Sequence, residues 1–502
     1  MRRLVWALAG LLWTVAAAWG AQDPVASMDR VLGRLEGEME AQRKAFRIPG
    51  MAVAVVQDGK ILFAKGYGVR RRGGAEPVTP ETVFQVGSTT KAFTSALVAL
   101  LVEKGALGWE DRVTDHLPAF RMYDPWVTRE FQVRDLMAQH SGLPAYSGDL
   151  LSLLGFDRAA MIRALEFYRP VTSFRSTFAY VNHLWLVAAA LYEAVAGESW
   201  EEGMKRRLLE PLGMGDSTLD RKGFLETENR VGLHRLRNGR LETIPEDWPF
   251  LDWAYLYGPA GGLNASVRDM AKWTVFQLSG KAGDRSLLKP ETLAALHRPQ
   301  TVAGDGSVFY CLGWVKTEAK PYPLVWHNGG TSGCHTLVQL VPEAGLGLVV
   351  LTNLEGTDFP EALGRRFADL WFGNPDRDWF GEARKALEEK PREAPVPSAR
   401  PGRPLSAYQG TFENPVYGRI VVTHRDGSLR GIWGPRRTPL AFHPAGGDTF
   451  ALEMGGTEPL GAAQFLFGEE GLSALYLEAL DDTGMGRFER VVPPSRQGTP
   501  QR

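Results

Sequence analysis

The chain has 502 residues, of which 44% are hydrophobic and 23% are charged, a composition typical of folded globular proteins that excludes a disordered or collagen-like chain. Its 57 Lys and Arg residues nearly balance its 58 Asp and Glu residues, so the formal net charge of −1 offers no bulk field to attract nucleic acid or an anionic membrane. At roughly 150 residues per unit, the length predicts about three structural units. We expect a small or neutral partner and no nucleic acid.

Residues 1–20 have the pattern of a secretory signal peptide. Arg2 and Arg3 precede an apolar stretch, 4–18, which ends at a small-x-small exit at Gly20. A membrane anchor is the alternative, but the apolar stretch is shorter than the roughly 20 residues that a bilayer-spanning helix needs. We therefore expect a cleaved leader, no stable membrane anchor, and a periplasmic or secreted mature protein.

Cys311 and Cys334 are the two cysteines of the chain, too few for the disulfide framework of a small secreted domain. The sequence is compatible with one bridge between them and also with two free thiols. The nine histidines form no HExxH spacing and no compact cluster with carboxylates, so we expect no metal site and no cofactor.

The first structural signals are two apolar runs, 51–56 and 61–67, joined by Asp58-Gly59, a strong hairpin signal. Residues from about 81 to 280 read mainly as helices. Among them, 88–104 has apolar residues at helical spacing and is followed by Gly105, a typical helix stop.

Strand patterns return late in this region, at 324–328, 335–341 and 347–353, and an amphipathic helix is expected at 360–372. Strands at both ends with helices between them predict an α/β fold, in which an antiparallel sheet is flanked by helices and carries a helical subdomain. We assign residues 26–372 to this domain.

The composition changes after this domain. Five prolines interrupt a charged segment, which predicts a linker over 373–404. Residues 405–495 then read as short strands with turns such as Asp426-Gly427, which predicts an all-β barrel of about eight strands. The prolines that mark the linker are Pro391, Pro395, Pro397, Pro401 and Pro404.

Ser88 and Lys91 are the first residues that indicate chemistry. Positions three apart lie on one helix face, so the Lys91 amine can reach the Ser88 hydroxyl. A serine needs an adjacent base to become a nucleophile, and burial lowers the pKa of a lysine enough to leave it partly neutral. The alternative is that Ser88 only caps the helix, because this pairing occurs often by chance.

Two further motifs follow in order, Tyr180-Val181-Asn182 and His327-Asn328-Gly329-Gly330. Taken singly, each also fits a packed side chain, a cap or a turn. With Ser88 and Lys91, however, the set resembles the serine β-lactamase and penicillin-binding protein superfamily, specifically its class C-like branch. Three further stretches resemble it too, at 133–144, 210–214 and 259–263, so that the resemblance covers residues 30–372.

The resemblance implies a role for each motif residue. Ser88 is implied as the acylated nucleophile, with Lys91 and Tyr180 as the proton-transfer pair. Asn182 is implied to hold the substrate carbonyl, and His327 occupies the place of the usual KTG lysine. Gly329 and Gly330 join the substrate-binding residues, and the backbone NH groups of Ser88 and Gly330 would form the oxyanion hole.

His327 is a departure from the family pattern, since a histidine is mostly neutral at pH 7 whereas lysine is a permanent cation. Recognition of a substrate carboxylate is therefore not implied. The expected substrate is a small peptide, an ester or a β-lactam-like molecule. The barrel resembles a lipocalin-like appendage that could bind an apolar ligand or close over the site. The resemblance thus implies an exported serine hydrolase that acts on amide or ester substrates by acyl-enzyme formation, as a peptidase, carboxypeptidase, esterase or β-lactamase. The alternative is a protein that binds penicillin or peptidoglycan fragments and is acylated, but turns them over slowly or not at all.

Overall fold

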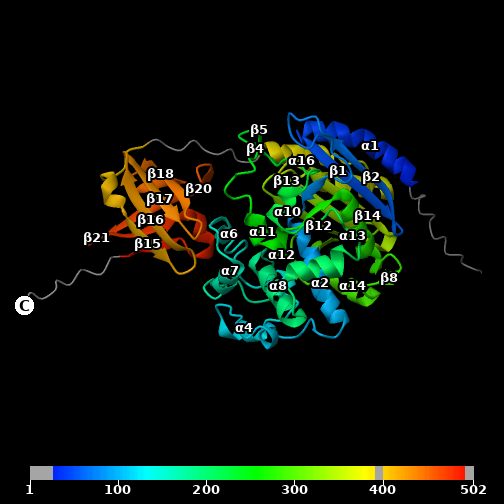
Figure 1. The fold of residues 1–502 in the computed structure, drawn as a ribbon, viewed down its shortest axis with the longest axis horizontal. Coiled ribbons are helices and arrows are strands. Elements are labelled where there is room, and N and C mark those ends of the chain that lie inside the picture. The colour runs from blue at the N-terminus through cyan, green and yellow to red at the C-terminus, as the bar shows by residue number, and fades with distance from the viewer. Residues whose placement is uncertain (1–26, 390–398, 492–502) are drawn as a thin grey trace, which may run out of the picture.

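The structure, a computed structural model, describes residues 27–389 and 399–491. The chain forms a large antiparallel sheet covered by helices, followed by a closed barrel that lies beside α6 and α7 (Figure 1). The fold class predicted from the sequence is therefore confirmed. The signal peptide predicted at 1–20 lies outside the described residues, as do the linker prolines Pro391, Pro395 and Pro397.

The predicted first hairpin is confirmed as β1 (Gly50–Gln57) and β2 (Lys60–Gly68). Asp58 and Gly59 in its turn have φ angles of 48° and 76°. Both are left-handed, as the turn that matches the twist of a two-residue hairpin requires.

This hairpin forms one edge of an eight-stranded sheet of order β2-β1-β14-β13-β12-β11-β10-β9, in which all neighbours are antiparallel. Of the late strands predicted from the sequence, β14 pairs with β1, β13 pairs with β14, and β12 pairs with β13. Their bounds, with those of the short strands beyond them, are β9 (Thr301–Val302), β10 (Val308–Tyr310), β11 (Val315–Thr317), β12 (Leu324–Thr331), β13 (Cys334–Val341) and β14 (Leu346–Thr352).

Both faces of the sheet are covered. Alternate residues of β1 point to opposite faces and so contribute to two separate cores. Met51, Val53 and Val55 belong to a core with α1 (Met28–Ala45), α15 (Phe359–Phe372) and α16 (Trp379–Glu388). Ala52 and Val56 belong to the larger core on the other face.

Helices and short strands between β2 and β9 build that larger core and the helical subdomain. The helices are α2 (Thr90–Glu103), α3 (Val113–His116), α4 (Pro125–Glu130), α5 (Asp135–Ala138), α6 (Leu150–Leu153), α7 (Arg158–Ala164), α8 (His183–Ala196), α9 (Trp200–Met204), α10 (Arg221–Glu226), α11 (Trp253–Leu256), α12 (Gly258–Gly261), α13 (Val267–Ser279) and α14 (Pro290–Leu296). The short strands are β3 (Val83–Gln85), β4 (His234–Arg237), β5 (Arg240–Thr243), β6 (Asn264–Ser266), β7 (Lys281–Ala282) and β8 (Arg285–Ser286).

Part of the segment predicted as a linker, 373–404, is a helix. The side chain of Phe380 in α16 packs against Phe46 and Phe359, with ring centroids 6.5 and 5.7 Å apart. These contacts place the apolar side of α16 in the core of the first domain, although charged residues surround it in the sequence.

The C-terminal strands close into a barrel in sequence order, from β15 to β22. Aromatic rings fill its interior: the Phe465 ring centroid lies 5.8, 5.7 and 5.4 Å from those of Phe412, Phe442 and Phe450. The strands are β15 (Gly410–Asn414), β16 (Gly418–Arg425), β17 (Ser428–Trp433), β18 (Thr438–Gly446), β19 (Thr449–Met454), β20 (Glu458–Gly468), β21 (Gly471–Leu477) and β22 (Arg487–Val491).

Cys311 and Cys334 are both buried and unbridged, which decides between the two alternatives that the sequence allowed. In the two described segments of the chain, no helix is both long and apolar enough to span a bilayer.

Candidate active site

Ser88 lies in a short turn, η1 (Gly87–Thr89), that leads directly into α2. The hydroxyls of Thr89 and Thr90 donate to the carbonyls of Val86 and Gly87 at 2.9 and 2.7 Å and so hold the turn in place. Helix α2 is buried along nearly its whole length because it is apolar on every side. The turn therefore presents Ser88 from a rigid support.

Lys91 reaches Ser88 as the spacing predicts. Its Nζ lies 3.0 Å from the Ser88 Oγ and donates to the Ala260 carbonyl at 2.9 Å. The side chain is completely buried, and this desolvation lowers the pKa of Lys91 to about 7, although the nearby Asp149 carboxylate opposes the shift. Close to neutral pH, a substantial fraction of Lys91 is an uncharged amine able to accept a proton.

Tyr180 completes the group around Ser88. Its ring centroid lies 4.7 Å from the Lys91 Nζ, and its hydroxyl interacts with the Ser88 side chain. Burial raises the pKa of Tyr180 above its usual value, so the phenol keeps its proton near neutral pH. Of the two predicted proton-transfer residues, Lys91 is thus the one whose charge changes in this range, and Tyr180 is a donor.

Asn182, two residues further on, donates from Nδ2 to Asp149 Oδ2 at 2.8 Å. Sequence reasoning missed Asp149, which lines the pocket and whose pKa is raised by burial despite the hydrogen bond from Asn182. The available signal was its place five residues after Pro144, at the end of a stretch that resembles the family. The carboxyl fixes which way the Asn182 amide points.

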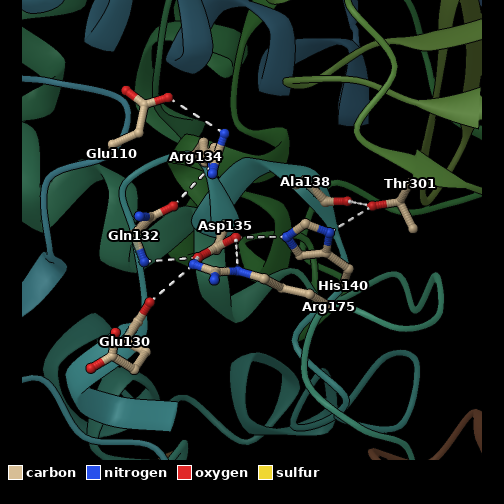
Figure 2. Close-up of polar contacts among 9 residues, drawn as sticks. All are labelled: Glu110, Glu130, Gln132, Arg134, Asp135, Ala138, His140, Arg175 and Thr301. Atoms are coloured by element: carbon tan, nitrogen blue, oxygen red, sulfur yellow. Dashed lines mark hydrogen bonds and ion pairs between the residues drawn. The ribbon is translucent and has the colours of Figure 1, made fainter.

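The loop before Tyr180 is held by an ionic cluster around the buried Asp135 (Figure 2). Arg175 donates to both oxygens of Asp135, with N–O distances of 3.0 and 2.6 Å, and His140 Nε2 lies 2.7 Å from the carboxylate. The backbone NH of Arg175 also bonds the His140 carbonyl at 2.8 Å. The cluster ties α5 to the loop that carries Tyr180.

Gln139 and Thr301 extend this support in two directions. Gln139 accepts from the backbone NH of Val181 at 2.7 Å, directly between Tyr180 and Asn182. Thr301 on β9 lies 2.9 Å from the His140 Nδ1 and so joins the cluster to the edge of the sheet. None of these contacts follows from sequence spacing, because each joins segments far apart in the chain.

His327 on β12 faces the group from the opposite side. Its Nδ1 bonds the Asn328 carbonyl at 2.6 Å, so this nitrogen carries the proton and Nε2 accepts from the Tyr310 hydroxyl at 3.2 Å. Burial, with a contribution from the Lys91 charge, lowers the pKa of His327 to about 3. The histidine is therefore neutral throughout the physiological range.

Glycines let the end of β12 run close to the Ser88 turn. Gly87 has a φ of 55°, and a Cβ there would lie 2.8 Å from the Gly330 nitrogen. A Cβ at Gly329 would collide with the Val86 carbonyl oxygen. Gly329 is buried in this contact, whereas Gly330 is exposed at the pocket.

A cavity of about 490 Å³ lies above these groups. None of the described residues that line it is an arginine or a lysine, and Asp149 is the carboxylate among them. Five predicted site residues line the cavity, namely Ser88, Tyr180, Asn182, His327 and Gly330. Seven aromatic side chains form much of its wall: Tyr146, Phe178, Tyr180, Trp253, Tyr257, Tyr310 and Trp326.

Comparison with known families agrees with this geometry. The profile of the Beta-lactamase family matches residues 35–370, about two thirds of the chain. The chain belongs to the Beta-lactamase family. A second profile, a domain of unknown function named DUF3471, matches residues 394–483, which include most of the barrel.

Individual relatives differ in how much of the chain they match. Unguisins hydrolase ungD' of Aspergillus campestris is 27% identical over 86% of each chain. Penicillin-binding protein 4 of Amycolatopsis lactamdurans is 31% identical over 62% of this chain and 83% of its own. The structure of an octameric penicillin-binding protein homologue from Pyrococcus abyssi superposes with a TM-score of 0.61 at 23% identity, covering 91% of this chain and 99% of that one. This last similarity establishes the fold alone.

Within residues 27–389 and 399–491, no group of three or more His, Cys, Asp or Glu side chains is placed to hold a metal ion. The polar groups around Ser88 are instead a hydroxyl, an amine, a phenol, an amide and a neutral imidazole. This set is suited to nucleophilic and proton-transfer chemistry on a carbonyl group.

Proposed function

We propose that the protein is an exported serine hydrolase that cleaves amide or ester bonds through an acyl-enzyme at Ser88. The observation that carries the proposal is the buried Lys91 amine, 3.0 Å from the Ser88 hydroxyl, with Tyr180 beside both. Family members with this arrangement are typically serine hydrolases, and a relative that extends over both domains is named a hydrolase.

In the proposed reaction, the Ser88 Oγ attacks the substrate carbonyl carbon while its proton passes to the neutral Lys91 amine. The negative charge on the carbonyl oxygen is stabilised by backbone NH groups of Ser88 and Gly330. The bond to the leaving group then breaks, and that group receives a proton through Tyr180 from Lys91. Water adds to the acyl-enzyme by the same route in reverse, which releases the acid and restores Ser88.

The pocket favours uncharged, apolar substrates. Aromatic rings provide much of its lining, and the neutral His327 stands where the family pattern leads us to expect a cationic lysine. Without an arginine or lysine among its described lining residues, the pocket offers no ion pair to a substrate carboxylate. We therefore propose a neutral peptide amide or an ester with a bulky apolar acyl group as the preferred substrate.

Export is proposed from the sequence of residues 1–20, with its two arginines, apolar stretch and small-residue exit. Sequencing the N-terminus of the mature protein tests it. A mature chain that starts near Gln22 supports export, and one that retains Met1 or Arg2 contradicts it.

The catalytic proposal is tested by replacing Ser88 with Ala. Turnover of p-nitrophenyl esters and aromatic aminoacyl anilides should fall on the order of 10⁴-fold or more, because the acylated oxygen is gone. Mass spectrometry should detect an acyl adduct on the unchanged chain and none on Ser88→Ala. Ser428→Ala, at an exposed position on the barrel strand β17, is the matched control and should retain full activity.

Two results would overturn the hydrolase assignment. The first is undiminished turnover by Ser88→Ala. The second is stoichiometric acylation of the unchanged protein without steady-state turnover of any ester or anilide, which is the result expected of a binding protein.

A further inference from the structure

The barrel docks onto the first domain through one of its two ends. The β15–β16, β17–β18 and β19–β20 turns all lie at that end, because successive hairpin turns of an up-and-down barrel alternate between the ends. Each of these turns contacts the helical subdomain or the β4–β5 hairpin, and the barrel lies beside α6 in Figure 1. One continuous cluster of buried apolar residues runs from the first domain into the barrel interior.

Arg436, in the β17–β18 turn, makes the most extensive of these contacts. Its Nη1 and Nη2 donate to the two oxygens of Asp252 at 2.7 and 3.0 Å, and its side chain also bonds the Pro249 carbonyl. Its backbone NH donates to the Leu154 carbonyl at 3.1 Å. Such paired guanidinium–carboxylate bonds fix geometry as well as adding energy. A Cβ at Gly434 would lie 2.9 Å from that of Leu154, so the turn seats tightly.

The two segments that Arg436 joins are both pocket walls. Leu154 directly follows α6, whose N-cap is Asp149, and Asp252 directly precedes Trp253 at the start of α11. Asp149 and Trp253 line the cavity above Ser88. Trp253 is held at its other side by a 3.0 Å hydrogen bond from Nε1 to Ser332, in the turn after β12.

Tyr417 provides a second, buried connection from the β15–β16 turn. The Tyr168 hydroxyl donates to the Tyr417 hydroxyl at 3.3 Å, and both side chains are almost completely buried. The Tyr168 ring lies against His183, whose Nδ1 is 3.1 Å from the hydroxyl of Tyr257. Tyr257 also bonds the Gly148 carbonyl at 3.3 Å and lines the cavity.

A third contact orients the barrel without touching the pocket. Glu458, at the start of β20, accepts from Arg235 of β4 at 2.9 Å, and Thr457 in the same turn accepts from Trp248 at 3.4 Å. Three separated contacts leave a rigid body little freedom to rotate. Aromatic rings pack against one another inside the barrel, and the three docking contacts join this packed body to the first domain.

We infer that the barrel, which corresponds to the domain of unknown function, braces the substrate-binding wall formed by α6 and α11, with Arg436 and Tyr417 as positioning residues. The inference rests on the hydrolase function proposed above. It predicts that substrates large enough to contact Trp253 and Tyr257 depend on the barrel, whereas a small ester that occupies only the space at Ser88 does not.

The test uses the full chain with charge-swap variants at the docking pair. Arg436→Glu and Asp252→Arg, each alone, place like charges together and should raise KM for an aromatic aminoacyl anilide by about 5- to 20-fold, because a displaced wall weakens substrate positioning. The kcat/KM for p-nitrophenyl acetate should change less than about 2-fold. The double variant should recover most of the loss, which a change that merely impairs folding would not allow.

The matched control is Arg425→Ala, at an exposed arginine that ends β16 at the opposite end of the barrel, and it should leave turnover of both substrates unaffected. Hydrogen exchange gives a readout that needs no turnover. Arg436→Glu should speed exchange within 146–154 and 248–257 and leave β13 and β14 unchanged.

The outcomes separate the two proposals. If the unchanged protein shows no turnover that depends on Ser88, the proposed function is contradicted. The hydrogen-exchange measurement then still tests whether the barrel braces the pocket wall. Normal turnover combined with unaltered KM and unaltered exchange in the single variants overturns the brace. Equal losses for the large and small substrates, or no recovery in the double variant, overturn it as well.

Discussion

At the scale of single residues, the reactivity of Ser88 depends on the charge of Lys91. Desolvation inside α2 favours the neutral amine, while the Asp149 carboxyl nearby favours the ammonium form. These two effects oppose each other. Burial also raises the pKa of Asp149 to about 7, so the two groups titrate over the same range and together set the pH at which Lys91 becomes a base. His327 and Tyr180, by contrast, keep one protonation state near pH 7.

This balance predicts the pH dependence of the reaction. Lys91 accepts the Ser88 proton only when neutral, so kcat/KM should rise with pH through a limb centred near 7. Asp149→Asn removes the negative charge that favours the ammonium form, so the limb should move to lower pH. Rates of the unchanged chain and of Asp149→Asn, measured with a neutral ester between pH 5 and 9, check the shift. A limb that moves to higher pH in Asp149→Asn would contradict this assignment.

The residues that sequence reasoning found and those that it missed differ in how they are brought to the site. Lys91 is three positions from Ser88 on the same helix, so local geometry alone predicts their contact. Asp149 and Tyr310 reach the site through long-range packing, for which a single sequence has no spacing rule. Tyr180 and His327 are an intermediate case. Local geometry does not link them to Ser88, but the order of the three motifs along the chain resembles that of a known family.

At the scale of elements, the loop that carries Tyr180 has no regular structure of its own. Residues 165–182 include no helix or strand, and Arg175 has a left-handed φ of 62°. Such a loop keeps one conformation only if surrounding groups fix it. The ionic cluster of Asp135, His140 and Arg175 and the backbone contact with Gln139 provide this support.

Arg175→Met should therefore impair catalysis more than its distance from the chemistry suggests. Asp135 loses a charged partner, and since Arg175 is partly exposed we expect a loss of unfolding free energy of only about 1 to 3 kcal/mol. Displacement of Tyr180 should lower kcat/KM by about 10- to 100-fold. Thermal unfolding and steady-state kinetics measure the two effects. Arg129→Met, at an exposed position in α4, is the control and should change neither.

The same cluster predicts how the stability loss depends on pH. Burial raises the pKa of Asp135, but hydrogen bonds from His140 and Arg175 outweigh it and hold that pKa below its usual value. The stability this provides is present above the unfolded pKa near 4 and is lost as pH falls through the folded pKa. The difference between Arg175→Met and the unchanged chain should shrink in strong acid. A difference that persists or grows there would contradict the ionic role.

Helix α16 illustrates which elements sequence patterns predict poorly. Hairpin β1–β2, helix α2 and the late strands were predicted because each has a strong local signal of turn residues or apolar periodicity. Residues 379–388 carry the apolar spacing of Phe380 and Ala383 as well, yet prolines and charges nearby dominate the composition. Packing against Phe46 and Phe359, invisible in the sequence, places this helix in the first domain.

At the scale of the whole molecule, the order of the two parts could be predicted but their contact could not. Binary patterning and turn residues indicate a sheet domain followed by a barrel, because these are local features. Docking depends on single side chains such as Arg436 and Tyr417, which in sequence look like any other residues of hairpin turns. The pocket wall is therefore a property of the assembled chain rather than of the domain that holds Ser88.

The cysteines allow the opening of the first domain to be followed separately from that of the barrel. Cys311 and Cys334 are the two cysteines of the chain, and both belong to the core beside the sheet. Burial raises the pKa of each thiol to about 12, so little of either thiol is ionised to the reactive thiolate at pH 8. Burial also keeps reagents from reaching the two sulfur atoms in the folded state.

Native protein at pH 8 should therefore react only slowly with a thiol reagent such as dithionitrobenzoate, whereas protein unfolded in guanidinium should release two equivalents without prior reduction. If the barrel opens first on heating, circular dichroism will change before the thiols react. If the docking contacts make the two parts cooperative, both signals will change together. Rapid labelling of the native chain, or fewer than two thiols in the unfolded chain, would contradict the buried, unbridged cysteines.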